Sequence, residues 1–438
     1  MQTQVVLEEL PTMPVVNPPS STWRFRTLIA FRFAFSYFVL YNIPFPIGAL
    51  PYTDAANDKY QELWHHVVPW VAKHFLHLGY DITVFSNGSG DTTYDYVLVL
   101  CFAALAFITT LAWSWLDRAQ TSYPRLYAWF RLYMRLALAN AMIAYGAFKV
   151  IPSQFPAMSL SNLMQTYGDS SPMGLLWKFM GASTAYTIFA GCCELLGGLL
   201  LLIPRLTTLG SLVSTAVLSN VLMLNMSYDV PVKLYSFHLL LMAMVLVIPD
   251  AKRLADFFVL NREARPARAV NLFDRPQFNR AALVLQLGLG VIFAATYFYQ
   301  SEQAIRSDTS HPPFYGVWSV DEFSLDGQVV TPEPSHTTRW NRILFEFTEV
   351  MTIQPLTGSP QNFRLEINQD KKTLTLTRRI EPDFKAEFTF DNSQPEIMSL
   401  EGQFSGHPTT AKLHRTNVPS FLLRTRGFHW INEYPFNR

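Results

Sequence analysis

The chain has little charge, few cysteines and none of the common nucleotide or hydrolase motifs. Only 15% of its 438 residues are charged, against about 25% in average soluble domains. A net charge of +1 gives no signal for nucleic acid as a partner. Cys101, Cys192 and Cys193 all lie in apolar segments, so the polar C-terminal third has no disulfide framework. The missing motifs argue against ATP-driven transport, dinucleotide binding and thioredoxin-type redox chemistry.

Apolar residues dominate instead. Half of the chain is hydrophobic and 14% is aromatic, which indicates a membrane protein. We expect no cleavable signal peptide, because the first apolar run, Phe25–Ile47, is too long for one. Seven runs are long enough to cross a bilayer as helices. They cover residues 25–47, 95–116, 126–151, 182–203, 207–227, 231–249 and 281–299.

Loop charges predict the orientation of these spans. The segment 250–280 carries seven Lys and Arg residues, whereas the loop 48–93 carries two lysines and five acids. Because positive loops stay on the cytoplasmic side, we place residues 1–23 and 250–280 in the cytoplasm. We expect the seven spans to form a helical bundle over residues 24–300. An odd number of spans then puts the C-terminal segment 305–438 on the side of the membrane opposite the cytoplasm. Within the external excursion 48–93, residues 60–78 are amphipathic and suit a helix lying in the membrane interface.

Residues 305–438 have the alternating pattern of short strands separated by turns. The pattern predicts an antiparallel sandwich or small barrel. Gly316-Val317-Trp318 opens the first strand, and Arg424 and Arg426 lie near the last, an arrangement that resembles the lipocalin-like barrels. In that resemblance Trp318 and one of the two arginines close a barrel end. The predicted strands are Ile343–Phe347, Phe363–Ile367, Thr373–Thr377, Phe384–Phe390 and Ala411–His414, with a hairpin turn at Asn368–Lys371.

Polar side chains interrupt five of the apolar runs. Counted at ~1.5 Å per residue from the cytoplasmic helix ends, they lie roughly 12 to 20 Å deep. Unpaired charges at that depth are expensive, so we expect these side chains to face one another inside the bundle. They are Arg32, Arg135, Glu194, Asn220 and His238.

Two interpretations of this layer remain open. In the first it is a buried pocket, where Glu194 and His238 manage protons and Arg135 holds Glu194 ionised; these three are the candidate catalytic residues. In the second it is structural, with Arg135–Glu194 as a buried ion pair and Asn220 as a helix-packing hydrogen bond. Taken alone, His238 fits a satisfied interior histidine better than a site. The candidate substrate-binding residues are Arg32, Tyr145, Lys149, Asn220 and Asn225.

A second polar layer lies nearer the outer surface. It contains Tyr145, Lys149, Gln154, Asn225, Asp229 and Lys233. Lys233 suits snorkelling toward the headgroups, while Lys149 suits snorkelling and the rim of a pocket equally well. The histidines 65, 66, 74 and 77 lack a carboxylate or cysteine at a recognisable ligand spacing, so we predict an interfacial belt and no metal site.

The third to sixth spans carry two short motifs. Gly146-Ala147-Phe148-Lys149 ends one span, and Glu194-Leu195-Leu196-Gly197-Gly198 lies in the next, followed by Pro204-Arg205. Over about residues 125–250 this resembles the DoxX family of four-helix bacterial membrane proteins. The resemblance implies a link to quinol oxidases and thiosulfate oxidation, and it singles out Lys149, Glu194 and Arg205. A bundle with an external β-domain also resembles, at the level of architecture, the class that includes the vitamin K-dependent carboxylases.

The sequence supports two kinds of function and leaves open whether the protein is an enzyme. The first is a redox-associated subunit of the bacterial inner membrane that handles a quinone or another lipophilic small molecule in the polar layer. The second is non-enzymatic: the β-domain, in the periplasm, binds a lipid or lipoprotein, or the protein assembles with subunits of a membrane complex. No haem, metal or nucleotide motif is present, so quinone is the cofactor we consider.

Overall fold

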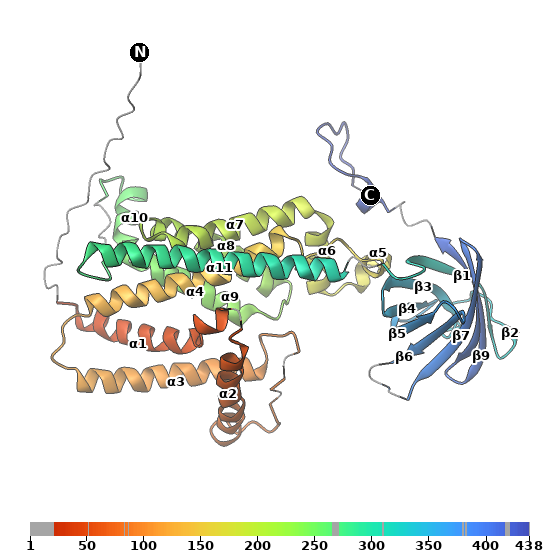
Figure 1. Ribbon diagram of the computed structural model, residues 1–438, viewed down its shortest axis with the longest axis horizontal. Helices are drawn as coiled ribbons and strands as arrows, with labels where there is room; N and C mark the ends of the chain where they lie inside the picture. The colour runs from red at the N-terminus through yellow and green to blue at the C-terminus, as the bar shows by residue number, and fades with distance from the viewer. Residues whose placement is uncertain are drawn as a thin grey trace, which may run out of the picture.

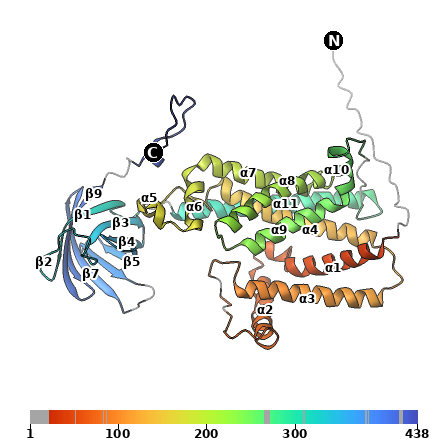
Figure 2. The same ribbon diagram turned by 180° about the vertical axis from the view of Figure 1, so that it is seen from behind.

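The computed structural model describes residues 22–437, except 51, 83, 86, 265–270, 309–310, 379–380, 382 and 417–420. Residues 1–21 and the predicted cytoplasmic charges Arg265 and Arg268 therefore lie outside the described residues. A bundle of long helices occupies one part of the molecule and a β-barrel lies beyond one end of it (Figure 1). The same arrangement is seen from behind in Figure 2.

Seven long helices run along the long axis of the bundle, whereas α2 (Asp54–His74) lies across that direction (Figures 1 and 2). The long helices are α1 (Phe25–Asn42), α3 (Thr93–Leu116), α4 (Pro124–Val150), α7 (Thr184–Leu202), α8 (Thr207–Ser227), α9 (Lys233–Val247) and α11 (Pro276–Asp308). Short helices connect them: α5 (Leu160–Met164), α6 (Pro172–Ala182) and α10 (Ala251–Phe258). Every predicted span is thus helical.

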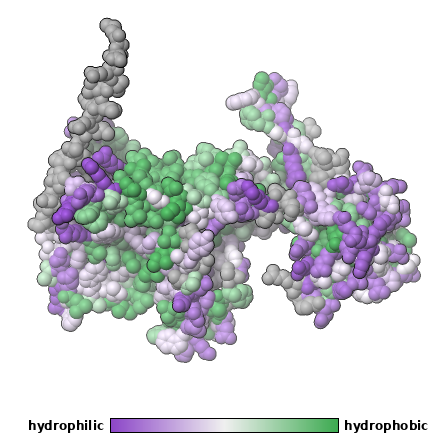
Figure 3. All heavy atoms as spheres, viewed as in Figure 1, coloured by the Kyte–Doolittle hydropathy of each residue, from purple (hydrophilic) through white to green (hydrophobic). Residues whose placement is uncertain are grey.

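Five helical segments in the described part of the chain are long and apolar enough to cross a membrane. They comprise α3, α7, α8, α9 and α11, with α8 extended by the short turn before it and α9 continued through α10. The predicted count of seven spans is not confirmed, because α1 and α4 do not meet both criteria. Each carries arginines, among them Arg32 in α1 and Arg135 in α4. Figure 3 shows one face of the molecule, on which apolar residues gather over the bundle and polar residues dominate the barrel.

The C-terminal domain is an eight-stranded antiparallel barrel. Consecutive strands pair in a meander, and pairing of β1 with β9 closes the ring, with β2 attached to β1 as a short hairpin. The strands are β1 (Gly316–Leu325), β2 (Gln328–Val329), β3 (Trp340–Phe347), β4 (Val350–Pro355), β5 (Gln361–Asn368), β6 (Thr373–Thr377), β7 (Lys385–Gln394), β8 (Ile397–Phe404) and β9 (His407–Thr416).

The five predicted strands and the first strand that Gly316 opens are confirmed, as is the turn between β5 and β6. Sequence reasoning missed the two-residue β2 as well as β4 and β8. In β8 only Met398 and Leu400 are fully buried, so its alternation is too short to stand out from the polar residues around it. The burial of alternate residues follows from strand geometry, in which successive side chains point to opposite faces.

The barrel interior is filled by side chains. Trp318, Phe323, Phe345, Phe363 and Phe388 are each at most 2% exposed and belong to one cluster with the inward aliphatic residues. Eight strands leave an interior that side chains can fill or that can hold one small ligand. Here large aromatic residues occupy that space.

The prediction for the arginine at the barrel end was wrong. Trp318 is buried, and its indole Nε1 donates to the carbonyl of Phe314 at 2.9 Å. The arginine beside it is Arg415, which pairs with Trp318 across β1 and β9 and donates to the carbonyl of Tyr315 at 2.6 Å. Arg424 lies instead on α12 (Leu422–Thr425) and donates to the carbonyl of Met158. The order of the chain could not reveal which late arginine faces Trp318, because strand register decides it.

Helix α5 connects the bundle to the barrel. The carboxylate of Glu346 on β3 accepts hydrogen bonds from the backbone N–H groups of Leu160 and Ser161. The hydroxyl of Ser161 donates to the same carboxylate at 2.8 Å. Leu160 is fully buried against Val317 and Leu344. These contacts satisfy amide groups at the helix start that have no partner inside the helix.

Candidate functional site

The buried carboxylate Glu194 forms an ion pair with Lys149. The Lys149 Nζ atom lies 2.8 Å and 2.7 Å from the two carboxylate oxygens, and both residues are at most 7% exposed. The ring of Tyr145 lies 5.4 Å from the same Nζ. The sequence placed Lys149 and Glu194 in separate layers and expected Arg135 as the partner of Glu194, and both expectations were wrong. Lys149 does not snorkel, and it joins α4 to α7.

Glycines bring α4 and α7 close enough for this pair to form. A Cβ atom added at Gly191 would lie 2.7 Å from the Cβ of Lys149 and 2.8 Å from the carbonyl oxygen of Gly146. A Cβ atom at Gly146 would lie 2.8 Å from the backbone nitrogen of Leu195. Small residues that let helix backbones approach are characteristic of packing in membranes. The two motifs in the sequence therefore have one structural role, which is to hold α4 against α7.

Arg135 terminates α7 rather than pairing with a carboxylate. Its Nε donates to the carbonyl of Leu201 at 3.0 Å, and its Nη2 donates to Leu202 and to Gln286. The last carbonyls of a helix lack partners within the helix, and a cation there is favourable. The depth estimate failed because it assumed that α4 and α7 begin at one level. The C-terminal end of α7 actually lies level with Arg135, whereas Lys149 is 14 residues further along α4, roughly 21 Å away.

Arg32 and Asn220 are likewise absent from any shared layer. Arg32 donates to the carbonyl of Asp117 at 2.9 Å and to the Tyr123 hydroxyl at 2.7 Å, near the turn between α3 and α4. Burial raises the pKa of that Tyr123 hydroxyl, which in turn donates to the carboxylate of Asp117. Asn220 is exposed on α8. The helix-packing amide is Asn225 instead, which is buried and donates to Ser236 on α9 at 3.1 Å.

His238 lies in a separate environment with Tyr37. The Tyr37 hydroxyl lies 2.6 Å from Nε2 of His238, and Nδ1 lies 2.6 Å from the carbonyl oxygen of Leu234. The ring of Tyr41 stacks on the imidazole with centroids 4.2 Å apart and planes 9° apart. His238 is 3% exposed and Tyr37 is 8% exposed. Sequence reasoning identified the histidine and missed Tyr37, because no spacing links α1 to α9.

A cleft of about 370 Å³ opens beside this pair, between α1, α3 and α9. Its walls are apolar except for Tyr37 and His238. The lining consists of Phe33, Ala34, Tyr37, Phe38, Val99, Ala103, Leu234, Phe237, His238 and Leu241. Ligand sites are commonly concave, mostly apolar and 300–1,000 Å³ in volume, with a few placed polar groups. This cleft has that character, and it is the candidate site of the described residues.

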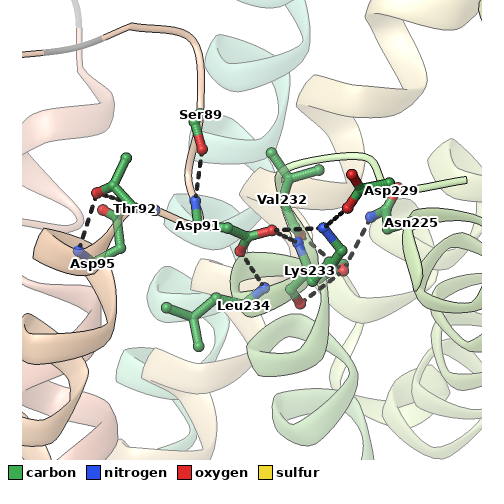
Figure 4. A network of polar contacts seen from close by, with 10 residues as sticks. Ser89, Asp91, Thr92, Asp95, Asn225, Asp229, Val232, Lys233 and Leu234 are labelled. Carbon is green, nitrogen blue, oxygen red and sulfur yellow. Dashed lines mark hydrogen bonds and ion pairs between the residues drawn. The ribbon is translucent and has the colours of Figure 1, made fainter. Parts of the chain in front are cut away.

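A polar network joins the N-terminal ends of α3 and α9, two of the helices that form the cleft. The Asp91 carboxylate, in the loop before α3, accepts from the backbone N–H groups of Lys233 and Leu234, each at 2.8 Å (Figure 4). The side chain of Lys233 contacts Asp229 at 2.8 Å and Asp91 at 3.7 Å, so its ammonium group pairs with two carboxylates, and its snorkelling toward headgroups stays a prediction. A carboxylate at the first turn of a helix satisfies free donors and complements the helix dipole. Asp91 therefore ties the start of α9 to the start of α3.

The histidines of α2 do not converge on a metal site in the described residues. His65 packs edge-on against Tyr94, and His74 lies 2.9 Å from the carbonyl oxygen of Trp70. The described part of the chain has no group of three or more His, Cys, Asp or Glu side chains arranged to hold a metal ion. The candidate chemistry is therefore that of the tyrosine, the histidine and whatever occupies the cleft.

Comparison with known proteins shows similarity to an uncharacterized bacterial protein. The chain is 31% identical over 124 residues to the uncharacterized protein YwoB of Bacillus subtilis (strain 168). The match covers 28% of this chain and 79% of YwoB. The chain belongs to the YwoB family. Most of the chain, however, lies outside the region shared with YwoB, and YwoB carries no stated activity. No protein-family model and no solved structure matches the chain.

Proposed function

We propose that the protein is a multi-pass membrane protein that binds a lipophilic molecule with an oxygen-bearing head, of the quinone class, in the cleft between α1, α3 and α9. The observation that carries the proposal is the Tyr37–His238 pair, a buried hydrogen bond between two titratable groups in the wall of an apolar cleft. Polar residues inside membrane proteins are costly, and those that remain tend to serve function.

The Lys149–Glu194 pair contributes to this function through structure. Both groups are fully paired with each other and neither lines the cleft, so we assign the pair to holding α4 against α7. Of the candidate residues from the sequence, His238 is the one that lies in the proposed site. A redox-associated role, as the resemblance to the DoxX family implies, is compatible with a quinone ligand and stays part of the proposal.

We further propose seven spans, with α1 and α4 crossing the membrane inside the bundle alongside the five apolar segments. Their arginines Arg32 and Arg135 are buried and donate to carbonyl groups, so they need not face lipid. This count places the barrel opposite the loops 117–123 and 250–280, in the periplasm of a bacterial inner membrane. The lipocalin-like interpretation of the barrel also remains a proposal.

The alternative function, lipid or lipoprotein binding inside the barrel, has less support. Aromatic residues such as Phe345 and Phe388 are fully buried at its centre. A ligand there would have to displace several large side chains at a cost in packing. The outer surface of the barrel remains available for contact with subunits of a membrane complex.

The test is a titration of the full-length protein, in lipid nanodiscs, with a decyl-substituted benzoquinone in its oxidised and reduced forms. We expect saturable binding of at least one form by calorimetry. Ala103→Leu fills the cleft and should weaken binding at least tenfold. The matched control is Ala104→Leu, one residue further along α3, where the side chain is exposed on the outer face of the helix. Equal affinities for the two variants would contradict the site.

A further inference from the structure

The donor and acceptor roles of the Tyr37–His238 pair follow from its surroundings. A backbone carbonyl oxygen only accepts hydrogen bonds, so Nδ1 of His238, at 2.6 Å from the oxygen of Leu234, carries a proton. None of the described Asp and Glu residues lies within ion-pair distance of His238, and a charged imidazolium is costly among apolar side chains. The neutral ring therefore has a bare Nε2, which accepts the proton of the Tyr37 hydroxyl at 2.6 Å.

This leaves the Tyr37 oxygen as an acceptor. Its single proton is committed to His238, while its lone pairs have no donor among the described residues. Tyr37 lines the cleft, and the remaining side chains of the lining are apolar apart from His238. The polar group that the cleft offers to a ligand is thus an acceptor.

Ring stacking holds the pair in this orientation. Tyr37 packs on Phe33 with centroids 5.9 Å apart and planes at 11°, and it packs on Tyr41 at 6.3 Å and 14°. Tyr41 stacks in turn on His238. These contacts, each of which contributes to packing, fix the positions of the rings, while the contact of Nδ1 with the Leu234 carbonyl fixes which imidazole nitrogen carries the proton. The cleft therefore offers a ligand the Tyr37 oxygen as an acceptor, in a position set by the side chains that line the cleft.

We infer that the cleft selects a lipophilic ligand that carries a hydroxyl group, and that within the quinone class it prefers the reduced quinol to the quinone. A ligand hydroxyl can donate to the Tyr37 oxygen, whereas a carbonyl oxygen would meet another acceptor and leave both groups unsatisfied. Sites built to hydrogen-bond a ligand group discriminate strongly against analogues that lack it. This inference rests on the proposed function and specifies its ligand.

The experiment compares two redox-inert ligands that share one skeleton, 4-heptylphenol and 4-heptylanisole. Both are titrated against the full-length protein in nanodiscs. The phenol can donate and the methyl ether can only accept, so we expect the phenol to bind about tenfold more tightly. In His238→Leu the Tyr37 proton is released for the ligand, and the preference should fall to about twofold or less. Tyr297→Phe removes a comparable hydroxyl that donates to Asn140 outside the cleft and should keep the preference.

Each outcome decides between the two claims. Equal affinities for phenol and ether in the wild type, with binding still lost in Ala103→Leu, would overturn the selectivity and leave the proposed function standing. Such a result would mean that the cleft binds the apolar chain of a ligand and does not discriminate between polar head groups. Absence of saturable binding, or binding that Ala103→Leu leaves unchanged, would overturn the proposed function itself. An unchanged preference in His238→Leu would refute the assigned role of Tyr37, and the wild-type comparison remains decisive if that variant does not fold.

Discussion

Single buried polar residues in this protein have specific partners rather than a common one. Glu194 binds Lys149, Arg135 binds the last carbonyls of α7, and His238 binds Tyr37. Each arrangement satisfies the hydrogen-bonding groups locally, as burial in an apolar environment requires. Because these groups do not share one site, we assign a structural role to the Lys149–Glu194 pair and a ligand-binding role to His238.

At the residue scale, the Lys149–Glu194 ion pair leads to a prediction about stability. Lys149→Met leaves a buried carboxylate without its partner and should lower the free energy of unfolding by about 3–5 kcal/mol. The double variant Lys149→Met with Glu194→Met removes both charges and should recover most of that loss. Unfolding of the purified protein in mixed micelles, followed by circular dichroism, measures the difference. Full stability in Lys149→Met alone would be incompatible with the ion pair.

At the scale of elements, contact between α4 and α7 depends on residues without side chains. The interface repeats small residues at helical spacing, including Gly146 on α4 and Gly191 and Gly198 on α7. Close backbone approach lets van der Waals packing hold helices together where lipid provides no hydrophobic driving force between them. The ion pair and the glycines therefore act together on one interface.

A pair of glycine substitutions tests this interface. Gly146→Ala puts a methyl group 2.6 Å from Cγ of Leu195 and 2.8 Å from its backbone nitrogen, so the helices must separate. We expect a loss of about 1–3 kcal/mol in unfolding free energy. Gly288→Ala is the control, since no atom lies within 4 Å of the added carbon on α11. It should be neutral or stabilise the helix by up to about 1 kcal/mol. Equal effects of the two variants in the same micelle assay would rule out tight packing at Gly146.

At the scale of the whole molecule, the bundle and the barrel divide the chain into an apolar part and a polar part (Figure 3). Helix α5 joins them through the Glu346 carboxylate on β3. Whether the barrel lies opposite the α3–α4 loop depends on the number of crossings between them. Helices α7, α8, α9 and α11 are long and apolar enough for four crossings, and α4 would be the fifth.

Cysteine labelling tests that count. In a variant with its three cysteines changed to serine, we introduce Asp370→Cys in the β5–β6 turn or Ala119→Cys in the α3–α4 loop, both exposed positions. Five crossings put the two on opposite faces, and the positive-inside rule puts the barrel outside. A membrane-impermeant maleimide should then label position 370 in intact spheroplasts and position 119 only after permeabilisation. Labelling of both positions in intact spheroplasts, or of neither before permeabilisation, would put them on one face and contradict the crossing by α4.

Local patterns were enough for much of the architecture. The long apolar runs determined where the helices form, and alternation of inward and outward residues determined strands such as Phe363–Ile367 and Thr373–Thr377. Both signals depend on residues near each other in the chain, since helices and strands have fixed periods. The same local view identified Lys149, Glu194 and His238 as unusual.

By itself, then, the sequence determined the helices, most of the strands and, except for Asn220, the polar residues of the first predicted layer that lie buried. Only the tertiary structure decided which of them meet. The offset between α4 and α7 pairs Glu194 with Lys149 instead of Arg135, strand register places Arg415 beside Trp318, and the packing of α1 on α9 brings Tyr37 to His238. These pairings join residues 45 to 201 positions apart. Helix offset and strand register are set by packing between elements, and no local periodicity specifies them.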